Sequence, residues 1–201
     1  DFNINPDSII KLITKKTKAI IPVHLTGKIC KINEIEKIAK KHNLHVIEDA
    51  AQAVGAMYKS KKAGSFGITG CFSLHPLKNL HVHGDGGVLT TNNKKIYQKI
   101  LKLRNHGLRN RDECEFWGYN SRLDNIQAAI ARIKLKDIEK INNKFKNIAK
   151  IYNYEFSKIL EIPLDDKNRK SVYHRYVIKS NKRDQLKKYL YSKGIETKIN
   201  Y

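Results

Sequence analysis

The chain has 201 residues, a length that suits one large domain, or one domain and part of a second. Hydrophobic residues make up 40% of it, which is enough for a packed core and excludes a wholly disordered chain. The formal net charge is +21, but the lysines are spread along the chain, and no zinc finger, RNP-like motif or basic arm accompanies them. We therefore predict no nucleic-acid partner.

The terminal and cysteine patterns limit the class of protein further. No apolar run is long enough to span a membrane, and the start of the chain lacks a signal-peptide pattern, so we predict no membrane partner. Cys30, Cys71 and Cys114 are scattered and show no metal-ligand spacing, so we predict no metal site and a cytoplasmic protein. The chain does not begin with methionine, and we expect it to be a piece of a longer protein.

The first predicted elements alternate between strand and helix. Residues 17–25 form a short apolar run that predicts a buried strand. Residues 33–43 carry their apolar side chains on one helical face, and residues 44–50 predict a second buried strand. Strand, helix and strand in this order predict a βαβ unit, and hence a parallel sheet.

The next elements surround a loop that contains an unusual lysine. Residues 70–75 and 86–92 predict two further strands, and Lys78 lies in the loop between them. Residues 94–107 predict an amphipathic helix, and residues 108–120 a polar loop.

The last third of the chain is predicted to be mainly helical. Apolar residues recur at three-four spacing over 122–159, which predicts long helices with a break near 134–138. Residues 161–171 predict a polar connection, residues 172–180 a strand, and residues 182–194 a helix.

Two charged residues at strand ends suggest chemistry. Ligands of open α/β sheets bind beyond the carboxyl ends of strands, where Asp49 and Lys78 are both predicted to lie. Taken singly, Asp49 could cap the next turn and Lys78 could be an ordinary surface lysine. Together they supply what pyridoxal phosphate needs, a carboxylate for the ring nitrogen and an amine for the aldehyde carbon.

Seven blocks of the sequence strengthen this interpretation. They are "TKAIIPVHLTG", "VIEDAAQAVGA", "GSFGITGCFSLHPLKNL", "GDGG", "LRNHG", "GYNSRLDNIQAAI" and "GIETKINY". In order and spacing the chain resembles the sugar aminotransferases of DegT/DnrJ/StrS type over nearly its whole length. The resemblance implies an α/β fold, that of a fold type I pyridoxal-phosphate transferase with a mostly parallel sheet flanked by helices. It also implies that residues 1–160 are part of the large cofactor-binding domain, and that residues 161–201 begin a smaller C-terminal α/β domain.

The same resemblance implies the activity. The family transfers an amino group, commonly from glutamate, to a nucleotide-linked keto sugar in amino-sugar biosynthesis, and its members are usually homodimers. One alternative is a relative that binds the cofactor without transamination, either a sugar dehydratase or a regulator. The dehydratases carry histidine in place of the lysine, so Lys78 argues against that reading. A basic nucleic-acid-binding protein is the second alternative, supported only by the net charge.

The resemblance also implies roles for five residues. Asp49 matches the partner of the pyridine nitrogen, and Gln52 the residue beside the cofactor ring. Ser73 matches a phosphate-binding serine, and Lys78 the lysine that carries the aldehyde carbon. Asn120 matches an asparagine that reaches the cofactor phosphate of the neighbouring subunit. Their structural alternatives are a turn residue for Gln52, a small strand residue for Ser73 and a helix cap for Asn120.

Histidines are also frequent near these blocks. For each of them we expect a structural role, or a role at the edge of the substrate site, rather than catalysis. They are His24, His75, His81, His83 and His106.

Overall fold

The computed structural model describes residues 1–163 and 165–200. Leu164, in the predicted polar connection, and Tyr201, at the end of the last sequence block, lie outside the described residues.

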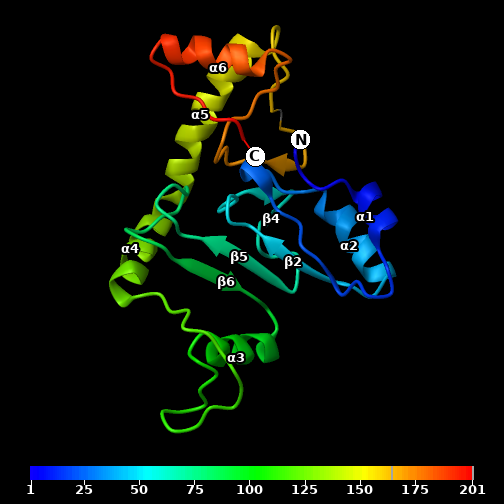
Figure 1. Ribbon diagram of the computed structural model, residues 1–201, viewed down its shortest axis with the longest axis vertical. Helices are drawn as coiled ribbons and strands as arrows, with labels where there is room; N and C mark the ends of the chain where they lie inside the picture. The colour runs from blue at the N-terminus through cyan, green and yellow to red at the C-terminus, as the bar shows by residue number, and fades with distance from the viewer. Residues whose placement is uncertain (164, 201) are drawn as a thin grey trace.

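A four-stranded sheet forms the centre of the fold (Figure 1). Its order is β1 (Ala19–Ile20), β2 (His45–Asp49), β5 (Thr69–Ser73) and β6 (Gly87–Thr90). The first three strands are parallel, and β6 returns antiparallel to β5. The predicted mostly parallel α/β sheet is confirmed, although β1 is much shorter than the apolar run 17–25.

Helix α2 (Ile32–Lys41) connects β1 to β2, which confirms the βαβ unit. The apolar face of α2 packs on the sheet: Ile32 and Ile35 form one cluster with Val46 of β2. Neither isoleucine has any exposed surface. Helix α1 (Pro6–Leu12) was not predicted. It begins at a capping asparagine followed by proline and packs beside α2.

Among the described residues, four helices follow the sheet in the chain: α3 (Lys94–Leu103), α4 (Asn125–Lys136), α5 (Ile138–Phe156) and α6 (Arg183–Ser192). The predicted break lies at Asp137, between α4 and α5. In Figure 1, α4 and α5 run as one long rod from the edge of the sheet, and α6 crosses the distal end of α5. Within the described ranges, no helix is long and apolar enough to cross a membrane.

The predicted strand over 172–180 is wrong. A short strand, β7 (Arg169–Lys170), comes before it and joins β3 (Met57–Tyr58) and β4 (Lys61–Lys62) in a second sheet. The main chain then leaves the sheet. The N–H of Val172 donates to the carbonyl of Gly27, and Gly27 lies in a 3₁₀ turn (Leu25–Gly27) rather than in a strand. Val172 is buried there, with its side chain against Gly27 of this turn.

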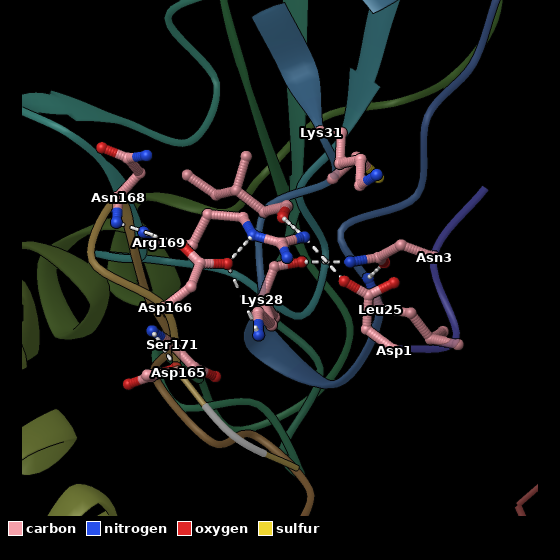
Figure 2. Close-up of polar contacts among 12 residues, drawn as sticks. Asp1, Asn3, Leu25, Lys28, Lys31, Asp165, Asp166, Asn168, Arg169 and Ser171 are labelled. Atoms are coloured by element: carbon pink, nitrogen blue, oxygen red, sulfur yellow. Dashed lines mark hydrogen bonds and ion pairs between the residues drawn. The ribbon is translucent and has the colours of Figure 1, made fainter. Parts of the chain in front are cut away.

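Charged side chains connect residues 166–169, which lead into β7, to the N-terminal part of the chain (Figure 2). Arg169 donates to Asp1 at 2.6 Å and pairs with Asp166, whose carboxylate lies 3.9 Å from the ammonium of Lys28. The main-chain N–H of Lys59 also donates to the carbonyl of Asn168 at 2.6 Å. Residues 166–169 are therefore bound to the start of the chain, to Lys28 and to the turn between β3 and β4.

A buried carboxylate links three parts of the fold. The side chain of Glu48 has no exposed surface and accepts hydrogen bonds from the main-chain N–H groups of Gly64 at 2.7 Å, Phe66 at 2.6 Å and Gly67 at 2.8 Å. It also accepts from Nε2 of the buried His24 at 2.9 Å. Burial by itself raises the pKa of Glu48, but these hydrogen bonds outweigh burial and bring it below the usual 4.5.

The Glu48 contacts generate a test of stability in the full-length protein. Glu48→Gln places an amide opposite donors, so we expect a loss of about 3 kcal/mol at neutral pH, measured by urea unfolding. Because the folded-state pKa of Glu48 is lowered, its stabilisation is present above pH 4.5 and is lost as the pH falls through the lower folded value. The gap between wild type and variant should therefore narrow below that pH.

Glu34→Gln is the matched control, because Glu34 is exposed and lies 3.9 Å from the ammonium of Lys31. Such pairs contribute less than about 1 kcal/mol. An equal loss in both variants, or a gap that does not change with pH, would contradict the assignment of a buried, ionised Glu48.

Candidate functional site

Asp49 is the last residue of β2 and points to the face opposite Glu48, because side chains alternate along a strand. Its register partner on β5 is Cys71, so Asp49, Cys71 and Ser73 share one face of the sheet. Burial and then the nearby charge of Asp49 raise the pKa of the Cys71 thiol, as this arrangement requires. The carboxylate of Asp49 and the hydroxyl of Ser73 therefore lie on one face of the sheet, near the carboxyl ends of two adjacent parallel strands.

Asp49 also closes the next turn. Its Oδ1 accepts from the N–H of Ala51 at 3.0 Å, so the turn-capping alternative is confirmed as a local role. The main-chain N–H of Asp49 donates to the carbonyl of Pro22, and the carbonyl of Asp49 accepts from the N–H of His24, both in the segment after β1. The carboxylate is thus held in a fixed direction at the sheet edge.

Gln52 is buried in the turn that follows, and its Oε1 accepts from the N–H of Thr26 at 2.8 Å. The contact ties the turn after β2 to the 3₁₀ turn after β1. Gln52 is therefore a turn residue, as its structural alternative had it, and it lies beside the same sheet edge as Asp49. Ser73 ends β5, and its Oγ accepts from the N–H of His75 at 3.3 Å.

Lys78 lies in the loop that leaves β5 and is partly buried. Its N–H donates to the carbonyl of His75 at 2.9 Å, and its own carbonyl accepts from Nδ1 of His81 at 3.0 Å. The loop returns to the sheet where the N–H of Val82 donates to Leu74 at 2.9 Å. Lys78 thus lies in the loop that follows the carboxyl end of β5, and β5 pairs with the strand that ends at Asp49.

Asn120 does not join these four residues. It is exposed, pairs with Asn105 just after α3, and accepts from Nε of Arg122 at 3.2 Å. Figure 1 shows the loop that follows α3 on the far side of β6 from the carboxyl ends of β2 and β5. The helix-cap alternative is wrong, because α4 begins at Asn125 with Asp124 at its N-cap.

The five histidines divide by position. His24 is a core residue, and its Nδ1 accepts from the N–H of Cys30 at 3.3 Å while Nε2 contacts Glu48. His75 and His81 hold the turn around Lys78, and His83 forms a reciprocal amide contact with Gln127 of α4. His106 is exposed, lies just after α3 and has a positive backbone φ of 60°.

Sequence analysis missed His174, which lies close enough to Lys78 for their charges to interact. Burial, then the charges of Lys78 and Arg175, lower the pKa of His174 to about 4, so its ring is neutral at physiological pH. The sequence analysis placed His174 inside the predicted strand 172–180. The cluster of aromatic and basic residues in "YHRY" is the sequence feature that could have singled it out.

A separate cavity of about 140 Å³ lies beside the charged cluster of Figure 2, next to Lys28 and Arg169. It does not include Asp49, Ser73 or Lys78. In the described part of the chain, no group of three His, Cys, Asp or Glu side chains could hold a metal ion. The candidate residues near the carboxyl ends of β2 and β5 carry a carboxylate (Asp49), an amide (Gln52), a hydroxyl (Ser73) and an amine (Lys78).

Comparisons with known proteins find relatives of this chain among sugar transaminases and regulatory proteins. A transaminase of Aneurinibacillus thermoaerophilus, named for dTDP-3-amino-3,6-dideoxy-alpha-D-galactopyranose, is 41% identical over 100% of this chain and 55% of its own length. A "Pleiotropic regulatory protein" of Geobacillus stearothermophilus is 39% identical, again over 100% of this chain and 55% of its own length. The chain thus spans about half the length of the curated relatives it matches.

Solved structures show the same fold. Streptomyces venezuelae DesV, in complex with a ketimine intermediate, has a TM-score of 0.93 and 34% identity, over 96% of this chain and 53% of that one. Bacillus subtilis NtdA, with bound cofactor PMP, has a TM-score of 0.91 and 30% identity, over 100% of this chain and 47% of that one. The sequence profile of one family matches residues 1–201. The chain belongs to the DegT/DnrJ/EryC1/StrS aminotransferase family.

Proposed function

We propose that the full-length protein is a pyridoxal-phosphate-dependent aminotransferase that moves an amino group from glutamate to a nucleotide-linked keto sugar. The observation that carries the proposal is the placement of Asp49, Ser73 and Lys78 at the carboxyl ends of adjacent strands, within a chain of this family. The named activity of the Aneurinibacillus relative supports a nucleotide-linked sugar as the substrate class.

The donor set fits this cofactor. A carboxylate suits a protonated pyridine nitrogen, a serine hydroxyl suits a phosphate oxygen, and a lysine amine suits an aldehyde carbon. Asp49 and Ser73 share one face of the sheet, and Lys78 follows on the loop from β5. The amide of Gln52 lies in the turn beside them. When bound, the cofactor supplies an electron sink for the carbanion left when the donor loses its α-proton.

The residues of this chain would divide the work. Lys78 would bind the aldehyde carbon covalently until the amino donor displaces it. Its free Nζ would then take the proton from the α-carbon of glutamate and deliver it to the adjacent cofactor carbon. Asp49 would hold the pyridine nitrogen in its positive form, which its fixed direction at the end of β2 favours. The same steps in reverse would aminate the keto sugar.

The remaining parts of the proposal concern the assembly. We infer a cytoplasmic homodimer in which Asn120 reaches the cofactor phosphate of the partner subunit, which suits the exposure of Asn120 in this chain. Residues 1–160 would belong to the large domain, and residues 161–201 would begin the smaller one.

A regulator is the second candidate, favoured by the relative named as a pleiotropic regulatory protein. Such a protein would bind the cofactor without turnover. Lys78 remains in this chain, so the proposal places the enzyme first.

Covalent attachment tests the assignment of Lys78. After borohydride reduction of the cofactor-loaded full-length protein, peptide mapping should find the pyridoxyl label on Lys78. Lys78→Ala should abolish the label, and Lys62→Ala should keep it, because Lys62 is exposed and pairs with Glu139 at 3.5 Å. A label on any other lysine would remove Lys78 from its role.

Asp49→Asn tests the carboxylate. An amide cannot hold the pyridinium proton, so turnover should fall by about three powers of ten, which is ~4 kcal/mol in barrier, while the protein still folds. Asp7→Asn, on exposed α1, is the matched control and should leave turnover unchanged. A near-native rate for Asp49→Asn would exclude Asp49 from the chemistry.

Amino transfer from glutamate to a panel of nucleotide-linked keto sugars separates enzyme from regulator and from nucleic-acid binder. We expect 2-oxoglutarate to form in proportion to the aminated sugar, as detected by mass spectrometry. Cofactor binding with no product from any sugar would favour the regulator. Absence of cofactor binding, with duplex DNA binding that survives physiological salt, would favour the nucleic-acid binder.

A further inference from the structure

Directly after Lys78, the chain turns inward through a buried amide. Asn79 is only 7% exposed, and its Nδ2 donates to Oδ1 of Asn142 at 2.8 Å and to the carbonyl of Val172 at 3.2 Å. Lys78 itself is held by main-chain contacts with His75 and His81. The main chain of Lys78 is therefore fixed on both sides, and one of these anchors lies in the core.

Asn142 is the core end of this anchor. It lies on α5, is 3% exposed, and its Nδ2 donates to the carbonyl of Val54 at 3.0 Å, in the segment after β2. Gly55 leaves room for it, since a Cβ there would come within 2.7 Å of the Asn142 amide nitrogen. Asn142 thus joins the segment that follows Asp49 to the segment that follows Lys78.

The two donations of Asn79 also orient His174. Because Nδ2 of Asn79 faces two carbonyl oxygens, its Oδ1 must face Nδ1 of His174, 3.1 Å away. That contact requires a proton on Nδ1, so the lone pair of the neutral ring is on Nε2. The partly buried ring beside Lys78 is thereby held in one tautomer.

We propose that Asn79 and Asn142 are positioning residues for Lys78, which fix the main chain at the lysine relative to the segment after Asp49 and hold the adjacent His174 ring as its Nδ1–H tautomer. The inference rests on the proposed function, since it takes Lys78 as the residue that binds the cofactor. It deepens that function by assigning a positioning role to two buried side chains, Asn79 and Asn142, that the proposed function does not use.

Burial argues for orientation rather than for stability alone. The amide pair is buried, and its main-chain partners Val54 and Val172 are themselves buried apolar residues. An amide pair there gains little net stability over apolar side chains of similar volume, because its desolvation offsets its hydrogen bonds. Hydrogen bonds do impose a direction, which apolar packing does not. A catalytic amine on a loop depends on such direction.

The experiment measures how fast Lys78 captures the cofactor. Full-length apoprotein is mixed with pyridoxal phosphate, and covalent loading is followed by absorbance and by borohydride trapping with peptide mapping. Asn142→Leu keeps similar volume but loses both amide contacts, so we expect loading at Lys78 to slow by about ten- to a hundred-fold. Asn79→Ser removes the same contact from the loop side and should slow loading similarly.

Asn153→Leu is the matched control. Asn153 lies on the same helix α5 and accepts from the hydroxyl of Tyr176 at 2.7 Å, so its loss cuts a contact to the C-terminal segment without touching the Lys78 loop. We expect its Tm to fall as for Asn142→Leu while loading stays at the wild-type rate. Should Asn142→Leu fail to fold, Asn79→Ser decides.

The outcomes separate this inference from the function beneath it. Absence of the label from Lys78 in the wild-type protein would overturn both. Labelling of Lys78 in wild type, together with wild-type loading rates in Asn142→Leu and Asn79→Ser, would overturn the inference alone. Slowed loading in both variants, with normal loading in Asn153→Leu, would support it.

Discussion

The rest of the site depends on one buried carboxylate, Glu48. A charge without exposed surface is tolerable only when donors surround it, and three main-chain N–H groups and His24 do so. Two of the donors come from Gly64 and Gly67, and a Cβ on Gly67 would come within 2.3 Å of a carbonyl oxygen of β2. The loop can therefore approach the strand only with glycine there, and its N–H groups then satisfy the charge.

The same contact separates two roles along one strand. Since side chains alternate, Glu48 faces the loop and Asp49 faces the opposite side, where Ser73 also lies. Any slip of β2 by one residue would place Glu48 on the face of Ser73 and turn Asp49, the proposed partner of the cofactor ring, toward the loop. The four donors to Glu48 oppose that slip, because they can meet its oxygens in one register only. Glu48 and Asp49 therefore face opposite sides of the sheet. The sequence alone shows them only as two adjacent acidic residues.

How far the sequence predicts this molecule follows from the range of its interactions. The strands β2 and β5, the βαβ unit, and the loop position of Lys78 follow from local apolar runs. The polar contacts that fix the site join residues far apart in sequence: 24 positions for His24 and Glu48, 63 for Asn79 and Asn142. No local periodicity reports them. The expected strand over 172–180 failed for the same reason, since its main-chain partner is the distant turn at Gly27.

Two kinds of support hold the two proposed reacting groups. Asp49 ends a strand, where the ladder to its neighbours already limits movement. Lys78 lies on a loop, which the sheet cannot hold, and helices supply the missing restraint: Gln127 of α4 contacts His83, and Asn142 of α5 contacts Asn79. The long α4–α5 rod in Figure 1 is therefore more than a connection to the last part of the chain. Both helices restrain the loop through these contacts. The main chain at Lys78, the proposed cofactor-binding lysine, is therefore held in place.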